Sequence, residues 1–188
     1  GGASWRTQDP GIEEGILGIS FLDRRMGWAV GGHGAIVHTA NGGGTWIEQR
    51  AHEEHLWSVE FVDESNGWAV GDTATVLVTN NGGERWSQIV LATETDLYDV
   101  CFVDRENGWA VGREGAILHT SNGGLRWTPQ ASPVPQALRA VDFMDARTGW
   151  IVGEGGTVLR TDDAGSVWQL LPSPDPEATS FPNLLDVT

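Results

Sequence analysis

Short apolar segments of this chain carry two kinds of side chain that could do chemistry. The first kind is the carboxylate, and the four examples are Glu60, Asp99, Asp142 and Asp186. Two carboxylates on either side of a sugar can hydrolyse a glycosidic bond. The same segments hold Trp57, Tyr98 and Arg139, whose residue types dominate hot spots in protein interfaces. The side chains therefore allow sugar chemistry or partner binding, and the choice depends on the elements that position them.

One sequence of about 35 residues positions these side chains, because the chain repeats it four times. The copies cover residues 16–50, 56–90, 97–131 and 138–172. Each copy has two tryptophans at fixed places, spaced 40, 41 and 41 residues apart from copy to copy. They are Trp28, Trp68, Trp109 and Trp150 at the first place, and Trp46, Trp86, Trp127 and Trp168 at the second. A period of about 40 residues is typical of propellers, solenoids and arrays.

Each copy is predicted to form four short strands. In the second copy, Leu56, Val59 and Phe61 mark a first strand with one apolar face. An Asp and a Gly bracket the turn at 63–67, since Asp can bond the backbone two residues on and Gly accepts a positive φ. A second strand starts at Trp68, and a β-branched third strand follows. Nothing has a helical period, so we predict an all-β fold, a β-propeller of four-stranded antiparallel blades.

A Thr-x-Asn/Asp-x-Gly-x-x-Trp turn follows the third strand of every copy. The Asn or Asp side chain can accept hydrogen bonds from the backbone N–H groups that follow, the Gly can take a left-handed conformation, and the Trp can cover the corner. We therefore assign this turn a structural role. Its residues are Thr39, Asn41, Gly43 and Trp46; Thr79, Asn81, Gly83 and Trp86; Thr120, Asn122, Gly124 and Trp127; and Thr161, Asp163, Gly165 and Trp168.

The two ends of the chain match pieces of further copies. Residues 1–5 read like the second half of the turn just described, and residues 184–187 read like the start of a first strand. We therefore predict a single propeller domain over 1–188, with the last strand of a preceding blade in 1–10 and the first strand of a following blade in 181–188. Four complete blades with a strand at each end describe part of a larger propeller. Its incomplete end blades could associate with another copy of the chain.

The amino-acid composition limits the classes of partner that the chain can bind. The chain has 26 acidic residues against 11 basic ones, all arginine, for a formal net charge of −15. Such a surface repels phosphate backbones and anionic lipids, so we expect neither nucleic-acid binding nor membrane insertion. Cys101 is the single cysteine, which excludes an internal disulfide and a cysteine-based zinc cluster. His38 and His119 hold equivalent places, but Val78 and Arg160 replace them in the other copies. We predict no metal site and no cofactor.

The repeated turn resembles the Asp box of sialidase-type (BNR) repeats. Together with the phrases GWAVG (27–31) and AILHT (116–120), it resembles the photosystem II stability/assembly factor-like propellers. That resemblance implies a non-enzymatic scaffold that docks a protein partner, such as a subunit of a membrane complex, and an extracytoplasmic location. A shared blade does not carry a shared partner with it.

Two alternatives remain open. The first is a carbohydrate-binding or glycoside-hydrolase propeller of the sialidase kind, but the arginine cluster of sialidases is missing because Arg139 stands alone in that zone, and Tyr98 is the only tyrosine. The second is a purely structural subunit of a larger surface or membrane complex. Neither alternative changes the predicted fold.

Candidate binding residues lie where connectors between blades and turns between second and third strands share one face of a propeller. Trp57 is notable there, because it is the one tryptophan within the copies that the repeat does not require. The alternative is that these residues only pack between blades. The candidates for partner binding are Trp57, Tyr98, Arg139, His33, Asp72, Arg113, Glu114 and Glu154. On the opposite face, Arg24, Arg25, Arg105 and Arg147 alternate with acids and are expected to form a mixed-charge surface.

Overall fold

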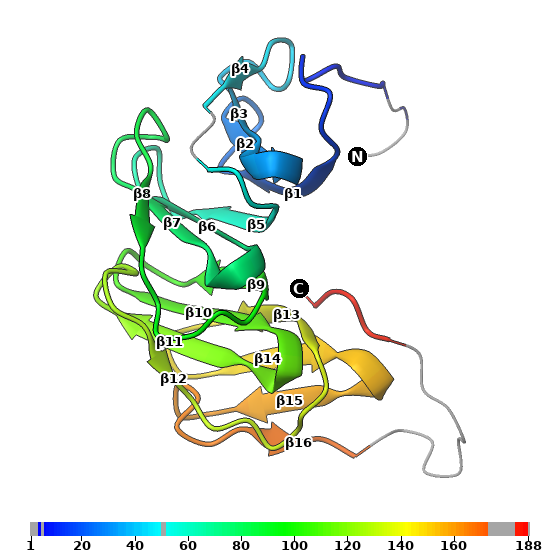
Figure 1. Ribbon diagram of the computed structural model, residues 1–188, viewed down its shortest axis with the longest axis vertical. Helices are drawn as coiled ribbons and strands as arrows, with labels where there is room; N and C mark the ends of the chain where they lie inside the picture. Colours follow the sequence, from blue (N-terminus) through cyan, green and yellow to red (C-terminus); the bar gives the residue numbers. More distant parts are fainter. Residues whose placement is uncertain (1–3, 5, 50–51, 173–182, 188) are drawn as a thin grey trace.

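The computed structural model describes residues 4, 6–49, 52–172 and 183–187. They form four separate four-stranded antiparallel sheets, each with its strands in sequence order (Figure 1). The first sheet consists of β1 (Ile16–Phe21), β2 (Gly27–Gly31), β3 (Ile36–Thr39) and β4 (Ile47–Glu48). The second consists of β5 (Leu56–Phe61), β6 (Gly67–Gly71), β7 (Val76–Thr79) and β8 (Ser87–Ile89). The third consists of β9 (Leu97–Phe102), β10 (Asn107–Gly112), β11 (Ile117–Ser121) and β12 (Thr128–Pro129). The fourth consists of β13 (Leu138–Phe143), β14 (Gly149–Gly153), β15 (Val158–Thr161) and β16 (Gln169–Leu170).

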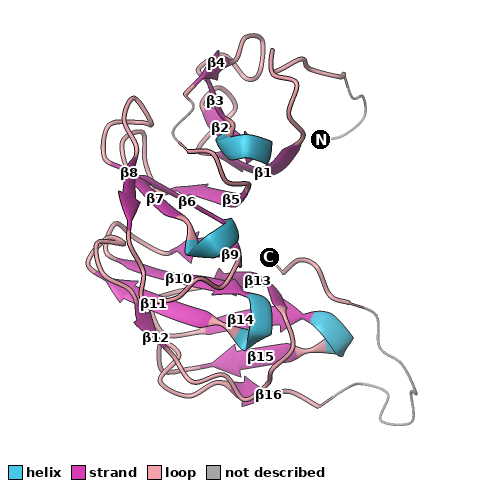
Figure 2. Cartoon of the chain, viewed as in Figure 1, coloured by secondary structure: helices cyan, strands magenta, loops and turns pink. Residues whose placement is uncertain are grey.

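The sheets follow one another as the blades of a partial propeller. Their first strands are the inner ones, because β1 contacts β5, β5 contacts β9, and β9 contacts β13. Within the described residues the only helical segments are short 3-10 turns, one after the second strand of each blade (Figure 2). These turns are η1 (Gly32–Gly34), η2 (Asp72–Ala74), η3 (Arg113–Gly115) and η4 (Glu154–Gly156). The predicted all-β propeller architecture is confirmed.

Stacked aromatic rings hold each blade to the next. Trp68 of β6 is 2% exposed and stacks on Phe102 of the following blade, with ring centroids 3.5 Å apart. Its indole N–H also donates a hydrogen bond of 2.9 Å to the carbonyl of Gly123. Trp28 and Trp109 make the same pair of contacts with their own following blades. Because a buried tryptophan removes about 150 to 250 Å² from water, these rings contribute much of the cohesion between blades.

The outermost blades lack one of these contacts. Phe21 is 43% exposed, whereas its equivalents Phe61 and Phe102 are 3% and 5% exposed. Trp150 is half-buried, and the Cζ of Arg160 lies 5.7 Å from its ring centroid. The rings of Phe21 and Trp150 lack the cover that their equivalents in the inner blades have, so the first and fourth sheets each present a face that another blade could cover. The four blades therefore form part of a propeller.

The described parts of the two ends occupy positions that the repeat predicts. The Gln8 amide donates to the carbonyl of Gly42 at 3.0 Å, as the Gln130 amide donates to Ala164 at 2.8 Å. At the other end, Asn183 accepts from the N–H of Gly155 at 3.2 Å. The described residues of these two segments form no strand. The domain limits at both ends stay predictions, since residues 1–3, 5, 173–182 and 188 lie outside the described part.

Polar side chains shape the turns after the third strands. The hydroxyl of Thr120 accepts a hydrogen bond of 3.0 Å from the N–H of Gly124, and Asn122 accepts one of 2.9 Å from the N–H of Arg126. In the last blade Asp163 takes the place of the asparagine and accepts from the N–H of Val167, also at 2.9 Å. An acceptor oxygen is therefore what this position requires, and either side chain supplies it.

Candidate binding surface

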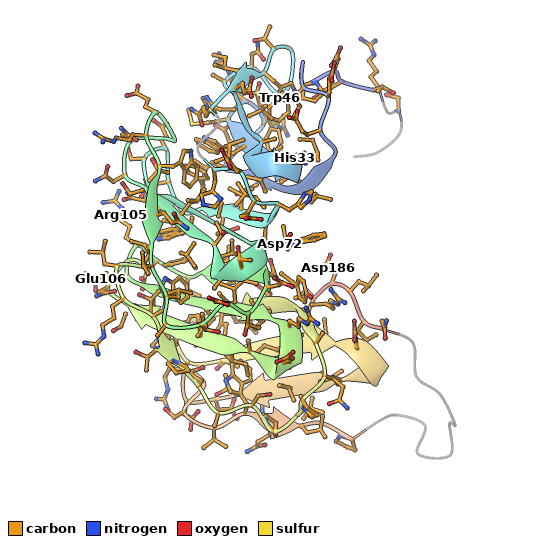
Figure 3. All side chains as sticks on the ribbon, viewed as in Figure 1. His33, Trp46, Asp72, Arg105, Glu106 and Asp186 are labelled. Carbon is orange, nitrogen blue, oxygen red and sulfur yellow. The ribbon has the colours of Figure 1, made fainter. Side chains whose placement is uncertain are left out.

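The loops of the blades divide between two opposite faces. On one face, connectors meet the 3-10 turns, since the N–H of Asp72 donates to His55 and that of Arg113 to Asp96. We call this the connector face, formed by residues 13–15, 32–34, 52–55, 72–74, 93–96, 113–115, 130–137 and 154–156. The other is the box face, formed by residues 22–26, 41–45, 62–66, 81–85, 103–106, 122–126, 144–148 and 162–167. Figure 3 places His33 and Asp72 on the first face, and Arg105 and Glu106 on the opposite side of the molecule.

A β-bulge aims one side chain of each inner strand at the connector face. In β5, Leu56 pairs with Gly71 and Ser58 pairs with Val70, so Trp57 is the extra residue of the bulge. Tyr98 holds the same position in β9, and Arg139 holds it in β13. A bulge interrupts strict alternation and redirects the side chain of its extra residue. The sequence shows the bulge indirectly, because the buried residues Leu56 and Val59 are three positions apart instead of two.

Two histidines of the connector face and the three bulge residues form a continuous row, which we call the rail: His33, His55, Trp57, Tyr98 and Arg139. Its ring centroids are 5.2 Å apart from His33 to His55, 6.4 Å from His55 to Trp57 and 6.0 Å from Trp57 to Tyr98. The guanidinium carbon of Arg139 lies 4.3 Å from the centroid of the Tyr98 ring, a cation–π contact. The rail thus joins side chains from all four blades.

Carboxylates of the 3-10 turns hold the rail in place. The indole N–H of Trp57 donates to Asp72 at 2.5 Å, and Arg139 forms an ion pair with Glu154. Both carboxylates are the first residue of their turn and follow the bulge residue by 15 positions. Because a bulge residue and a turn carboxylate recur 15 positions apart, the same local arrangement orients Trp57 in the second blade and Arg139 in the fourth.

The remaining predicted residues flank the rail without joining it. Arg113 forms ion pairs with Asp96 at 3.6 Å and with Glu114 at 3.7 Å. Glu114 has a φ of 59°, and His33 has a φ of 50°. Both are therefore the left-handed residue of their turn, and both side chains are exposed. His55 was not among the predicted site residues. The sequence feature that could have pointed to it is the variability of the residue before each first strand, which differs in every copy: Gly15, His55, Asp96, Ala137 and Asn183.

The inner strands also bring carboxylates together, as the sequence allowed. Burial raises the pKa of Glu60 to about 7, and the charges of Asp99 and Asp142 add to that effect. Burial likewise raises the pKa of Asp99 to about 6. Asp99 accepts hydrogen bonds from the hydroxyl of Ser58 at 2.7 Å and from the N–H of Val141 at 2.8 Å. One of these carboxylates is thus already committed to linking inner strands.

The thiol of Cys101 lies beside the same carboxylates. Burial raises its pKa to about 12, and the negative charges of Glu60 and Asp142 act in the same direction. Such a thiol stays protonated at neutral pH and is a poor nucleophile. Within the part of the chain that the structure describes, no group of three His, Cys, Asp or Glu side chains has the arrangement of metal ligands.

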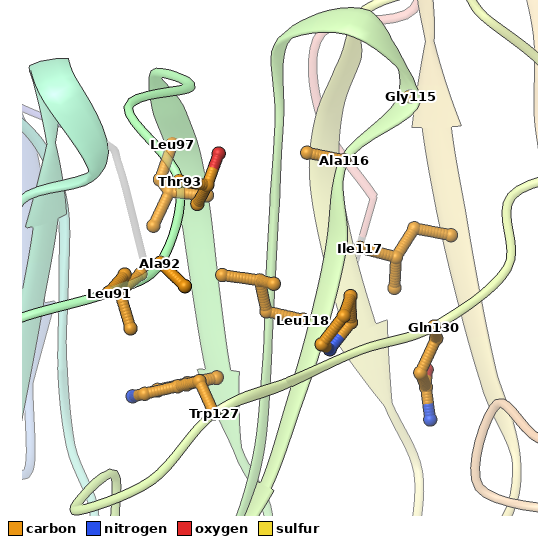
Figure 4. A pocket seen from close by; sticks show the side chains of 11 residues that line it. Leu91, Ala92, Thr93, Leu97, Gly115, Ala116, Ile117, Leu118, Trp127 and Gln130 are labelled. Carbon is orange, nitrogen blue, oxygen red and sulfur yellow. The ribbon is translucent and has the colours of Figure 1, made fainter.

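An apolar pocket of about 230 Å³ lies between the second and third blades, away from the rail (Figure 4). Leu91, Leu118 and Trp127 line it, and the indole N–H of Trp127 is buried without a hydrogen-bond partner. In the next blade the equivalent N–H, on Trp168, donates to Gln130 at 3.0 Å. Ile89 stands at the place of that glutamine. The indole N–H of Trp86 is unpaired too, although Gln49 holds the equivalent place there, so an unpaired N–H recurs in this repeat and does not by itself indicate a ligand.

These features define a class of protein, a partial β-propeller of Asp-box blades with an aromatic and cationic row at its inner rim. A family model described as photosynthesis system II assembly factor YCF48 matches the chain twice, at residues 2–94 and 84–175. The chain belongs to this family, as the resemblance in the sequence predicted. A search of curated proteins found no match.

Solved structures share the fold at low sequence identity. A structure titled "YCF48 bound to D1 peptide" is 18% identical with a TM-score of 0.60, over 88% of this chain and 86% of that one. YCF48 from Cyanidioschyzon merolae is 18% identical with a TM-score of 0.59, over 90% and 89% of the two chains. An ancestral GH74 enzyme is 15% identical with a TM-score of 0.72, over 91% of this chain and 26% of that enzyme.

Location was predicted from the family resemblance alone. Across the residues that the structure covers, we find no helix with the length and apolar character needed to cross a membrane.

Proposed function

We propose that this chain is a non-enzymatic scaffold that docks a protein partner on the connector face, with the rail as the binding site. The observation that carries the proposal is the rail itself, in which Trp57, Tyr98 and Arg139 are half-buried, in contact and oriented by Asp72 and Glu154. Tryptophan, tyrosine and arginine are the residue types that supply most of the energy of protein interfaces. A row that is already ordered loses little entropy when a partner binds.

The family supports a protein as the partner. The related YCF48 structure was solved with a D1 peptide, so a propeller of this family can bind a peptide. We extend this to a subunit of a membrane complex as the partner and to an extracytoplasmic site of action, both of which the family resemblance suggests. A scaffold of this kind would release its partner, whereas a purely structural subunit would stay bound in a fixed ratio.

A peptide array tests this proposal without assuming a partner. The array holds 12-residue peptides of acidic, neutral, basic and aromatic composition, and it is probed with the wild-type chain and with the double variant Trp57→Ala/Tyr98→Ala. We expect a subset of peptides to bind the wild type and to lose at least about tenfold in affinity with the variant, as for removal of interface hot spots. A matched control, Val90→Ala, changes a side chain that is 90% exposed away from the rail. Equal binding by all three proteins would refute a role for the rail.

Glycoside hydrolysis is a second candidate, favoured by one observation. Glu60 has a pKa of about 7 beside Asp99 and Asp142, and a general acid works best with a pKa near the working pH. Against it, both oxygens of Asp99 accept hydrogen bonds from the protein's own Ser58 and Val141. Release of reducing sugar from xyloglucan by the wild type, lost in Glu60→Gln, would favour this candidate over the scaffold.

A further inference from the structure

We propose that the connector face recognises a positively charged segment of its protein partner, rich in lysine or arginine, laid along the rail. The inference rests on the proposed function and adds the chemistry of the partner. The connector face and the rail together carry nine described carboxylates against Arg113 and Arg139, whereas the box face carries nine against six arginines.

The carboxylates of the connector face are Glu13, Glu14, Glu53, Glu54, Asp72, Glu94, Asp96, Glu114 and Glu154. On the box face the carboxylates are Asp23, Asp63, Glu64, Glu84, Asp104, Glu106, Asp145, Asp162 and Asp163, and the arginines are Arg24, Arg25, Arg85, Arg105, Arg126 and Arg147. A concentration of one sign of charge on one face attracts and orients a partner of the opposite sign.

Two hollows on the connector face have the chemistry to receive cationic side chains. One is lined by Glu94, Asp96, Glu114 and Arg113. Because Arg113 pairs with Asp96 and Glu114, Glu94 is the carboxylate there that no ion pair among the described residues neutralises. The other is lined by Glu13 and Glu14 together with His33 and His55. The rail begins in the second hollow, since His33 and His55 belong to both. An extended segment on the rail therefore passes carboxylates on its way across the face.

The rings of the rail suit the same ligand. A lysine or arginine packs its stem against an aromatic surface and places its charge over the ring, which is the geometry of a cation–π contact. The chain contains its own example, because the guanidinium of Arg139 lies 4.3 Å from the centroid of the Tyr98 ring. Trp57 offers a larger ring in the same row, and Asp72 bonds its N–H. A negatively charged segment would meet the surrounding carboxylates instead and be repelled.

The test uses three fluorescein-labelled peptides of equal length, of alternating alanine and lysine, alanine and glutamine, or alanine and glutamate. Binding to the wild-type chain is measured by fluorescence anisotropy at low and high salt. We expect the lysine peptide to bind and the other two not to bind, and we expect the affinity to fall at least about tenfold from 50 mM to 500 mM salt because exposed charges are screened. Equal binding of the glutamine or glutamate peptide would overturn the inference.

Matched variants locate the binding face. The triple variant Glu13→Gln/Glu94→Gln/Glu114→Gln removes three exposed charges from the connector face, and Glu64→Gln/Glu84→Gln/Glu106→Gln removes three from the box face. We expect the first to weaken the lysine peptide about fivefold or more and the second to change it less than about twofold. An equal loss in both variants would show attraction by net charge alone and would overturn a site on the connector face.

The two proposals fail in different ways. If array peptides of neutral or acidic composition bind and depend on Trp57 and Tyr98, the rail is a docking site and the cationic partner is wrong. If the lysine peptide binds the connector face equally well in Trp57→Ala/Tyr98→Ala, recognition of a cationic segment by the connector face is supported, and the assignment of the rail as the binding site is wrong.

Discussion

On the box face, the aspartate that opens each turn after a first strand accepts hydrogen bonds from the backbone of that turn, whereas the described carboxylates of the connector face accept none from their own turns. Asp104 accepts hydrogen bonds from the backbone N–H groups of Glu106 and Asn107, both at 2.7 Å. On the connector face, Glu94 and Glu114 are exposed and cap no described backbone N–H. The two faces carry equal numbers of described carboxylates, so the difference lies in what surrounds them. A carboxylate that accepts backbone hydrogen bonds has fewer lone pairs left for a partner, even where it is exposed, as Asp104 is.

Hydrogen bonds from the turn backbone also lower the pKa values of box-face aspartates. Hydrogen bonds from the backbone N–H groups of Arg147 and Thr148 lower the pKa of Asp145, and those from Met26 and Arg25 lower the pKa of Asp23. For Asp63, burial acts in the opposite direction, but hydrogen bonds from Ser65 and Asn66 outweigh it and hold the pKa at about 2. These shifts show that ionised carboxylates stabilise the box face.

The largest expected effect is the loss of one buried hydroxyl on the box face. Thr120 is 1% exposed, and its hydroxyl accepts from the N–H of Gly124. In Thr120→Val the buried N–H loses its acceptor, so the free energy of unfolding should fall by about 2 to 3 kcal/mol in chemical denaturation.

Its counterpart on the connector face is Thr157→Val. That hydroxyl donates only to the carbonyl of Glu154, which also accepts the N–H of Thr157, so the loss should stay below about 1 kcal/mol. Thr120→Ser keeps the hydroxyl and should recover most of the stability. Equal losses in the two valine variants would break the contrast between the faces.

The carboxylates of the inner strands, which lie between the two faces, should titrate in the opposite sense. The pKa of Glu60 rises on folding from 4.5 to about 7, so the unfolded chain ionises first and stability falls as the pH rises through this range. We expect a loss on the order of 2 kcal/mol between pH 5 and pH 8. Glu60→Gln, which cannot ionise, should flatten the profile in denaturation experiments at several pH values. An unchanged slope would mean that Glu60 is ionised in the folded protein.

The stability that box-face carboxylates contribute should be lost in acid, unlike that of the inner-strand carboxylates. Because the pKa of Asp63 falls on folding from 3.8 to about 2, its contribution is present above about pH 4 and disappears as the pH drops to about 2. The neutral variant Asp63→Asn should therefore lose stability at pH 5 and converge on the wild type near pH 2, as followed by circular dichroism. Parallel curves at all pH values would contradict a stabilising charge at this turn.

A smaller effect should separate single carboxylates of the two faces. Asp104→Ala removes the acceptor of two backbone N–H groups, and such caps contribute about 1 kcal/mol. Glu94→Ala removes an exposed side chain from the connector face and should stay within about 0.5 kcal/mol of the wild type. Thermal unfolding of both variants measures the difference, which should vanish if both carboxylates only face solvent.

The smallest expected effect is a gain on the connector face. Ala74 ends η2 with a φ of 55°, where Gly34 and Gly115 have φ values of 67° and 72°. The turn keeps its shape, so the missing glycine costs backbone strain. Ala74→Gly should raise the free energy of unfolding by up to about 1 kcal/mol, because a side chain is unfavourable at positive φ. Gly115→Ala should lower it, since its Cβ would meet the carbonyl of Val134.

Much of the fold could be predicted because its signals are local. The alternation around Val59 and Phe61, the Asp of each tight turn and the Gly of each corner depend on residues within a few positions of one another. Repetition at 40 or 41 residues then made each blade a copy of the last. The positions of Trp57, Tyr98 and Arg139 on equivalent strands followed from the same register.

The candidate site could be predicted only in part. His55 was missed because it lies before a strand and differs in every copy, and its contact with Trp57 depends on the bulge of β5. Arg113 was placed with the rail, yet the structure pairs it with Asp96 and Glu114. Long side chains can reach several neighbours, and the repeat does not specify which one they choose.

The sequence by itself determined the strands, the turns, the four blades and the family, because each depends on short-range backbone preferences repeated at a constant period. Only the tertiary structure decided that Trp57 touches Tyr98, that Arg139 covers the same ring and that Glu60 faces Asp99. These residues are about one repeat apart and meet because neighbouring inner strands pack side by side. Tertiary packing also sorted the charges, since each loop is sent to one face or the other by the blade that it closes.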